Sequence, residues 1–184
     1  MDKRIEKLSK VFGEMVENYN NGDLWKNIPL GREGFDIMKA LPYGIDGEVK
    51  DANEKAGLLS QMLGCMNELD TPRFCIEVRR YMRELGWTDN EALVKLEEYV
   101  APGTDAVEWG KKYDRHLKFD PVEMTEEWED NIYNVEKECD EKLKGESRGM
   151  GFCFNYWSMK RAVLAKYGIE WRSPQAMNPR VLFD

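Results

Sequence analysis

The chain has 184 residues but only one histidine and four cysteines, and it contains no long apolar run. A membrane-spanning helix requires roughly 18 consecutive apolar residues, and no stretch approaches that length. The N-terminal sequence MDKRIEKLSK lacks the apolar region of a secretory signal peptide. We therefore expect a cytoplasmic protein.

The cysteines and the histidine show none of the spacings that metal or nucleophilic sites use. A tetrahedral zinc site usually draws on two close ligand pairs, and the chain has no CxxC pair. P-loop, GxSxG, HExxH and Rossmann motifs are also missing, so no enzymatic reaction is indicated by a motif. We expect no cofactor, and reduced thiols at Cys65, Cys75, Cys139 and Cys153.

Alternating apolar and polar residues, which indicate strands, are nearly absent; 28–30 and 181–183 are the only extended candidates. Apolar residues instead recur every three or four positions, which predicts an all-α fold of six or seven helices with irregular loops. The segment 23–47 is rich in proline and glycine, and we expect it to be irregular. Capping residues are expected at Thr71, Thr88, Thr104 and Thr125. The predicted helices are 2–19, 49–69, 72–85, 89–100, 104–117, 125–144 and 152–167.

Charge is distributed unevenly along the chain, whose formal net charge is −8. The segment 120–146 holds 11 acidic and three basic residues, whereas 147–184 holds two acidic and six basic residues among many aromatics. This layout predicts a helical domain over 1–119, an acidic helix over 120–146 and a basic, aromatic C-terminal segment over 147–184. One narrow apolar stripe runs along the acidic helix, so the rest of that helix is expected to face water: Trp128, Ile132, Val135, Cys139 and Leu143.

A helix that carries acidic residues at this density creates a strongly negative surface potential. Such a surface can compete with phosphates for a basic groove on a partner protein. The alternative is a solvated face that keeps the protein soluble, with the first acidic residues favoured by the helix N-terminus. The predicted partner-binding residues are Glu126, Glu127, Asp130, Glu138 and Glu141.

Two further functions remain open at this point. Glu14 and Glu17 lie three residues apart in one predicted helix, and Glu48 and Asp51 lie three apart at the start of the next. This pattern resembles the all-α nucleotide pyrophosphohydrolases, and the resemblance implies that these four carboxylates bind magnesium.

The second alternative is a DNA-binding regulator, since 89–100 and 104–117 have the lengths of a helix-turn-helix. The balance of acidic and basic residues around this segment argues against strong duplex binding. The basic, aromatic segment 147–184 could contact single-stranded nucleic acid, but helical spacing places many of its aromatics on one core-facing side.

A last indication comes from the segment GFCFNYWSMKRAVLAKYGIEWRSPQAMNPRVLFD, residues 151–184. It resembles the C-terminal end of small proteins from mobile elements of gut Firmicutes. The acidic, helical character of the chain is similar to that of phage-encoded inhibitors of bacterial defence, among them the type II-A anti-CRISPR proteins. The resemblance implies a non-enzymatic protein in the host bacterial cytosol. It would bind an RNA-guided nuclease, whose nucleic acid lies in positively charged channels, and block nucleic-acid binding or cleavage.

Overall fold

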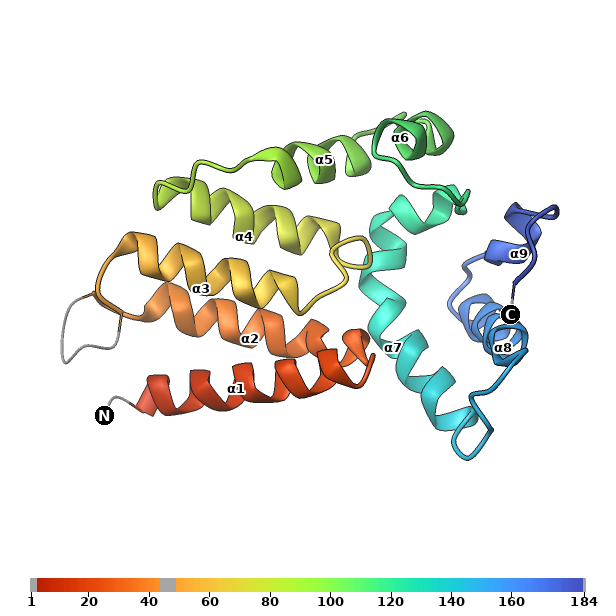
Figure 1. The fold of residues 1–184 in the computed structure, drawn as a ribbon, viewed down its shortest axis with the longest axis horizontal. Helices are drawn as coiled ribbons and strands as arrows, with labels where there is room; N and C mark the ends of the chain where they lie inside the picture. The colour runs from red at the N-terminus through yellow and green to blue at the C-terminus, as the bar shows by residue number, and fades with distance from the viewer. Residues whose placement is uncertain (1–2, 44–48, 184) are drawn as a thin grey trace. The chain divides into compact units, whose positions relative to one another are not determined.

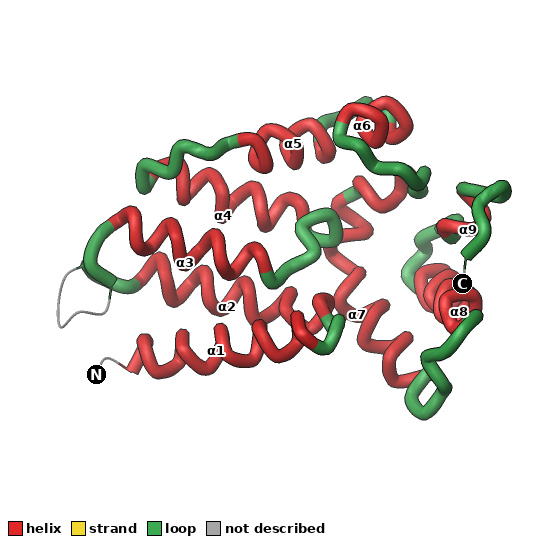
Figure 2. Tube along the Cα trace, in the orientation of Figure 1, coloured by secondary structure: helices red, strands yellow, loops and turns green. Residues whose placement is uncertain are grey.

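The computed structural model describes residues 3–43 and 49–183. In these ranges the chain is helical and contains no strand, which confirms the predicted fold class (Figure 2). The described residues form nine α-helices, eight of them with seven or more residues, so the prediction of six or seven was too low. The elements are α1 (Lys3–Asn20), a 3₁₀ turn η1 (Leu24–Lys26), α2 (Asn27–Ala40), α3 (Ala52–Gly64), α4 (Pro72–Glu84), α5 (Glu91–Val100), α6 (Ala106–Lys112), a 3₁₀ turn η2 (Pro121–Met124), α7 (Glu126–Lys142), α8 (Phe152–Lys166) and α9 (Pro174–Met177).

The chain divides into two compact units, Met1–Leu96 (unit 1) and Glu97–Asp184 (unit 2), with the division inside α5. The predicted acidic helix and basic C-terminal segment both fall within unit 2. None of the helices in the described ranges combines the length and the apolar content that crossing a membrane requires.

Unit 1 is built from α1, α2, α3 and α4, which pack in chain order, each against the next (Figure 1). Its core is formed by side chains that recur every three or four residues on these helices. Phe35 is one of its buried members, with the rings of Phe74 and Tyr81 edge-on at centroid distances of 5.9 and 5.7 Å. Such aromatic pairs add to the stabilisation that comes from burial alone.

The expectation that 23–47 is irregular was wrong for most of its length, because α2 occupies Asn27–Ala40. Pro29 lies in the first turn, where a backbone N–H has no intrahelical partner to lose. Gly31 and Gly34 are buried where α2 meets other parts of unit 1, and a Cβ on Gly31 would lie 2.6 Å from the sulfur of Met66. These glycines therefore allow close packing and do not break the helix, and the extended candidate 28–30 is helical as well.

Two predicted caps are also corrected. α5 begins at Glu91, whose backbone N–H donates to the side chain of Asp89, and the hydroxyl of Thr88 does not cap it. The N-cap of α6 is Asp105, not Thr104, and α6 ends at Lys112, five residues earlier than predicted. The second strand candidate, 181–183 near the C-terminus, is not a strand.

Unit 2 has two cores. Tyr99, Trp109 and Phe119 form an aromatic cluster with ring centroids 4.8 to 6.0 Å apart. The second lies along α7, which packs against α8. The predicted apolar stripe of α7 is confirmed as buried, with at most 7% of any member exposed: Trp128, Ile132, Val135, Cys139 and Leu143.

Candidate acidic interface on α7

α7 begins where the sequence predicts. The Thr125 hydroxyl accepts a hydrogen bond from the backbone N–H of Trp128 at 3.2 Å, which is the contact expected of an N-cap. Glu126, Glu127 and Glu129 occupy the first turn, where the positive end of the helix dipole favours carboxylates.

The five predicted partner-binding residues lie on one face of α7. At about 100° per residue they span about 120° of the helix circumference, on the side away from the buried stripe. Four are exposed and Glu138 is half-buried. The remainder of α7 is less exposed than predicted, because Glu129 and Glu136 are buried with 6 and 8% of their surfaces accessible.

Part of the negative charge of α7 is balanced inside unit 2. Four of the six basic residues of the C-terminal segment form ion pairs with acidic residues of 120–146, a property the sequence alone did not reveal. The pairs are Arg148–Asp140 at 3.0 Å, Lys160–Glu136 at 2.6 Å, Arg172–Asp120 at 2.9 Å, and Lys166–Glu138.

Glu138 is therefore the member of the predicted set that differs from the rest. Its carboxylate accepts a hydrogen bond from Lys166 and lies 3.6 Å from Lys142. The hydrogen bond from Lys166, followed by the charges of both lysines, lowers the pKa of Glu138 although partial burial opposes this. Its charge is compensated before any partner binds.

The other four carboxylates, those of Glu126, Glu127, Asp130 and Glu141, have no cationic partner within the described ranges. Lys137 lies among them on the same face and is exposed. We call these four carboxylates the acidic face of α7. Glu126, Glu127 and Asp130 lie at the start of α7 and Glu141 near its end, with the exposed Lys137 between them.

On the side of α7 that packs against α8, a buried polar cluster joins the two helices. The Nζ of Lys160 donates to Glu136 and lies 4.9 and 5.5 Å from the ring centroids of Trp128 and Trp171. The hydroxyl of Tyr156 donates to the same carboxylate at 2.7 Å. The indole faces stabilise the ammonium group, which is otherwise removed from water.

A second buried carboxylate, Asp120, connects η2 to the segment after α8. Its Oδ2 accepts hydrogen bonds from the backbone N–H and the Nε of Arg172, each at 2.9 Å, and its Oδ1 accepts from the N–H of Val122. Burial, the largest single influence, would raise the pKa of Asp120, but these hydrogen bonds together outweigh it and lower the pKa.

The carboxylates proposed for magnesium are not gathered in the described residues. Glu14 and Glu17 are exposed in the second half of α1, and Asp51 caps the start of α3 by accepting from Glu54. In Figure 1 the helices α1 to α4 lie side by side, with the last turns of α1 at one end of this row and the first turn of α3 at the other end. Glu48 lies outside the described residues. No group of three or more metal-ligating side chains occurs in the part of the chain that the structure describes.

The described residues also provide no support for the helix-turn-helix alternative. Its second helix is the seven-residue α6, whose basic side chains are ion-paired locally: Lys111 with Glu108 at 2.8 Å and Lys112 with Glu98 at 2.7 Å.

All four cysteines are free thiols. Burial raises the pKa of Cys139 to about 11, so at neutral pH this thiol stays protonated and is a poor nucleophile.

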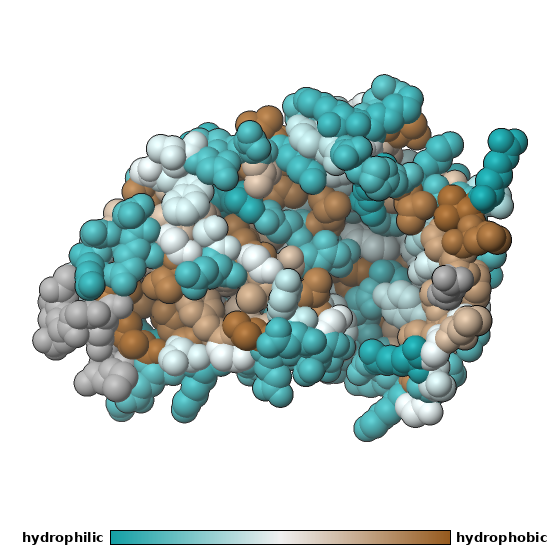
Figure 3. Space-filling model, viewed as in Figure 1, coloured by the Kyte–Doolittle hydropathy of each residue, from teal (hydrophilic) through white to brown (hydrophobic). Residues whose placement is uncertain are grey.

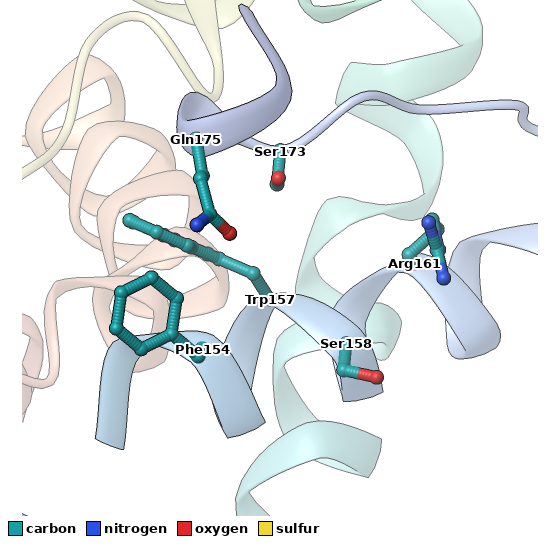
Figure 4. Close-up of a pocket in the computed structure, with 6 residues that line it drawn as sticks. All are labelled: Phe154, Trp157, Ser158, Arg161, Ser173 and Gln175. Carbon is teal, nitrogen blue, oxygen red and sulfur yellow. The ribbon is translucent and has the colours of Figure 1, made fainter. Parts of the chain in front are cut away.

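Sequence reasoning missed a pocket between α8 and α9 (Figure 4). Four of its residues share one face of α8, at the i, i+3, i+4 and i+7 positions that the helical repeat predicts. The sequence marks the whole segment 147–184 as basic and aromatic and indicates no role for this face, because the position of α9 depends on tertiary packing. The lining residues are Phe154, Trp157, Ser158, Arg161, Ser173 and Gln175.

Comparison of the chain with protein-family models, with curated proteins and with solved structures found no match in any of the three.

Proposed function

We propose that this protein is an inhibitor that binds a bacterial RNA-guided nuclease and blocks its nucleic-acid binding or cleavage. In this proposal the acidic face of α7 contacts a basic groove of the nuclease. The observation that supports it is that Glu126, Glu127, Asp130 and Glu141 are exposed on one helix face with no cationic partner among the described residues.

The dimensions of this face suit a groove that normally holds nucleic acid. At 1.5 Å per residue, Glu126 and Glu141 are about 22 Å apart along the helix axis. One strand of a duplex rises about 3.4 Å per nucleotide, so the face covers the length of about six phosphates. Nucleases of this class hold nucleic acid in positively charged channels and read a short duplex motif with arginines.

The ion pairs within unit 2 also support the proposed contact with a basic groove. Because Arg148, Lys160, Lys166 and Arg172 are paired with other acidic residues, they do not neutralise the acidic face. Its charge therefore attracts a basic partner over roughly a Debye length, about 8 Å at physiological ionic strength.

Charge reversal of the acidic face tests the proposal. The variant carries Glu126→Lys, Asp130→Lys and Glu141→Lys, three exposed positions that should tolerate lysine without loss of the fold. We expect its affinity for the nuclease to fall at least about tenfold at low salt, with a smaller difference at high salt. Binding is measured by biolayer interferometry across a salt titration, and inhibition by DNA cleavage.

The matched control places the same charge change on α1, with Glu6→Lys, Glu14→Lys and Glu17→Lys, all at exposed positions. It should bind and inhibit as the unmodified protein does. A second control omits the nuclease and titrates the protein against the guide and target nucleic acids. If the α7 variant inhibits normally at every salt concentration, the acidic face is only a solvated surface and the proposal fails.

A further inference from the structure

The pocket between α8 and α9 combines one uncompensated cation with several hydrogen-bonding groups. Arg161 is exposed and forms no ion pair with any described residue. Figure 4 shows it across the pocket from Trp157, with Ser158 and Ser173 between them on opposite sides. No carboxylate of residues 3–43 or 49–183 lines the pocket. This differs from the rest of unit 2, where most basic side chains with described contacts face acidic ones.

The hydrogen-bonding groups of the pocket are available to a ligand. The Ser173 oxygen accepts from the backbone N–H of Ala176 at 3.3 Å, which leaves its O–H free to donate. The hydroxyl of Ser158 and the carboxamide of Gln175 have no partner among the described residues. With the planar guanidinium of Arg161, whose fork of N–H groups matches an oxyanion, the pocket presents donors from both α8 and the start of α9.

The aromatic residues form a wall and do not offer a stacking surface. Trp157 lies edge-on to Phe154 at 5.7 Å and to Phe183 at 5.1 Å between ring centroids. The amide of Gln175 covers one face of the indole in Figure 4. These contacts hold Trp157 in place and leave little of its ring for a nucleobase.

The volume of the pocket limits the size of the ligand that it can hold. It is about 150 Å³, whereas sites for drug-sized molecules measure roughly 300–1,000 Å³. A space of this size accommodates a single ring or a tetrahedral oxyanion with a few waters. The geometry points to a binding site for the phosphate group of a phosphate monoester, with the rest of the molecule outside the pocket. This inference is independent of the proposed nuclease inhibition.

Inorganic phosphate and adenosine monophosphate are the two probes, titrated at constant ionic strength with chloride as the balancing anion. Binding is followed by the backbone amide shifts of 158–161, Ser173, Gln175 and Ala176 and by the side-chain amide of Gln175 in ¹H–¹⁵N spectra. We expect saturable shifts at these positions with a Kd on the order of millimolar, corresponding to a few hydrogen bonds to an exposed anion. Equal affinity for both probes identifies the phosphate group alone as the ligand, and tighter binding of the nucleotide identifies the ester.

Arg161→Gln should weaken binding of either probe at least about tenfold, which is the value of a charge-assisted hydrogen bond. Arg180→Gln is the matched control, because Arg180 is another exposed arginine of the same segment and does not line the pocket. It should change the affinity less than about twofold. Absence of saturable shifts with both probes, or equal binding by both variants, would overturn the inference.

Discussion

Asp120 is a single carboxylate that joins the start of η2 to the segment after α8, and 6% of its surface is exposed. Three hydrogen bonds, two from Arg172 and one from Val122, favour its charged form more than burial disfavours it, and its pKa is lowered. Such a group stabilises the fold fully above its unfolded pKa of about 3.9, and the contribution is lost as the pH falls through the lower folded value.

Asp120→Asn should therefore reduce the free energy of unfolding by about 1–3 kcal/mol at pH 7, the range for hydrogen bonds to a charged group. The difference from the unmodified protein should begin to shrink below about pH 4 and vanish once the pH falls below the lower folded pKa, where the folded aspartate is neutral too. Urea unfolding at several pH values measures this. The control is Asp140→Asn, because the ion pair of Asp140 with Arg148 is largely exposed and should contribute less than about 1 kcal/mol. An equal loss for both variants, or a loss that does not change with pH, would contradict the assignment.

At the level of single elements, α7 and α8 show how far helical periodicity carries a prediction. The N-cap at Thr125 and the buried stripe of α7 follow from local patterns, and both are confirmed. The ion pairs between these helices join residues 24 and 28 positions apart, so they depend on tertiary packing that no local pattern encodes. The same reason explains α2, where glycines that indicate a loop in isolation allow close contact in the folded unit.

The buried pair Lys160–Glu136 is expected to dominate the contact between α7 and α8. About a tenth of each side chain is exposed, so Lys160→Met leaves an uncompensated charge in the interior. We expect a loss of about 3–5 kcal/mol in the free energy of unfolding, measured with urea.

Adding Glu136→Gln to that variant should recover about half of the loss or more, because the neutral amide still accepts the hydrogen bond from Tyr156 and no longer needs a cation. A double variant as unstable as the single one would show that Lys160 acts through packing on Trp128 and Trp171, and not through its charge.

For the whole molecule, the sequence predicted the helical class and the position of most helices, and it did not predict a boundary inside α5. Leu93 and Leu96 are core residues in unit 1, whereas Tyr99 belongs to the aromatic cluster of unit 2. The apolar spacing that identifies α5 as a helix does not distinguish between the two cores that its residues join.

Because α5 contributes to both cores, we expect the two units to unfold together. A helix of ten residues has little stability in isolation, so loss of either core should melt it and weaken the other. Amide signals from 52–84 and from 126–166, followed in ¹H–¹⁵N spectra along a urea titration, should disappear with one common midpoint. Two separate midpoints would show that the units are independent despite the helix they share.

Because α5 is shared by the two units, it also limits where the chain can be divided into fragments. A fragment that stops at Leu96 would end in the middle of α5 and expose backbone carbonyls that have lost their N–H partners, and a fragment that starts at Glu97 would begin with the corresponding unpaired donors. Dissection of the molecule should therefore retain the whole of Glu91–Val100 on both pieces. Each half then carries a complete copy of the helix, at the expense of ten duplicated residues.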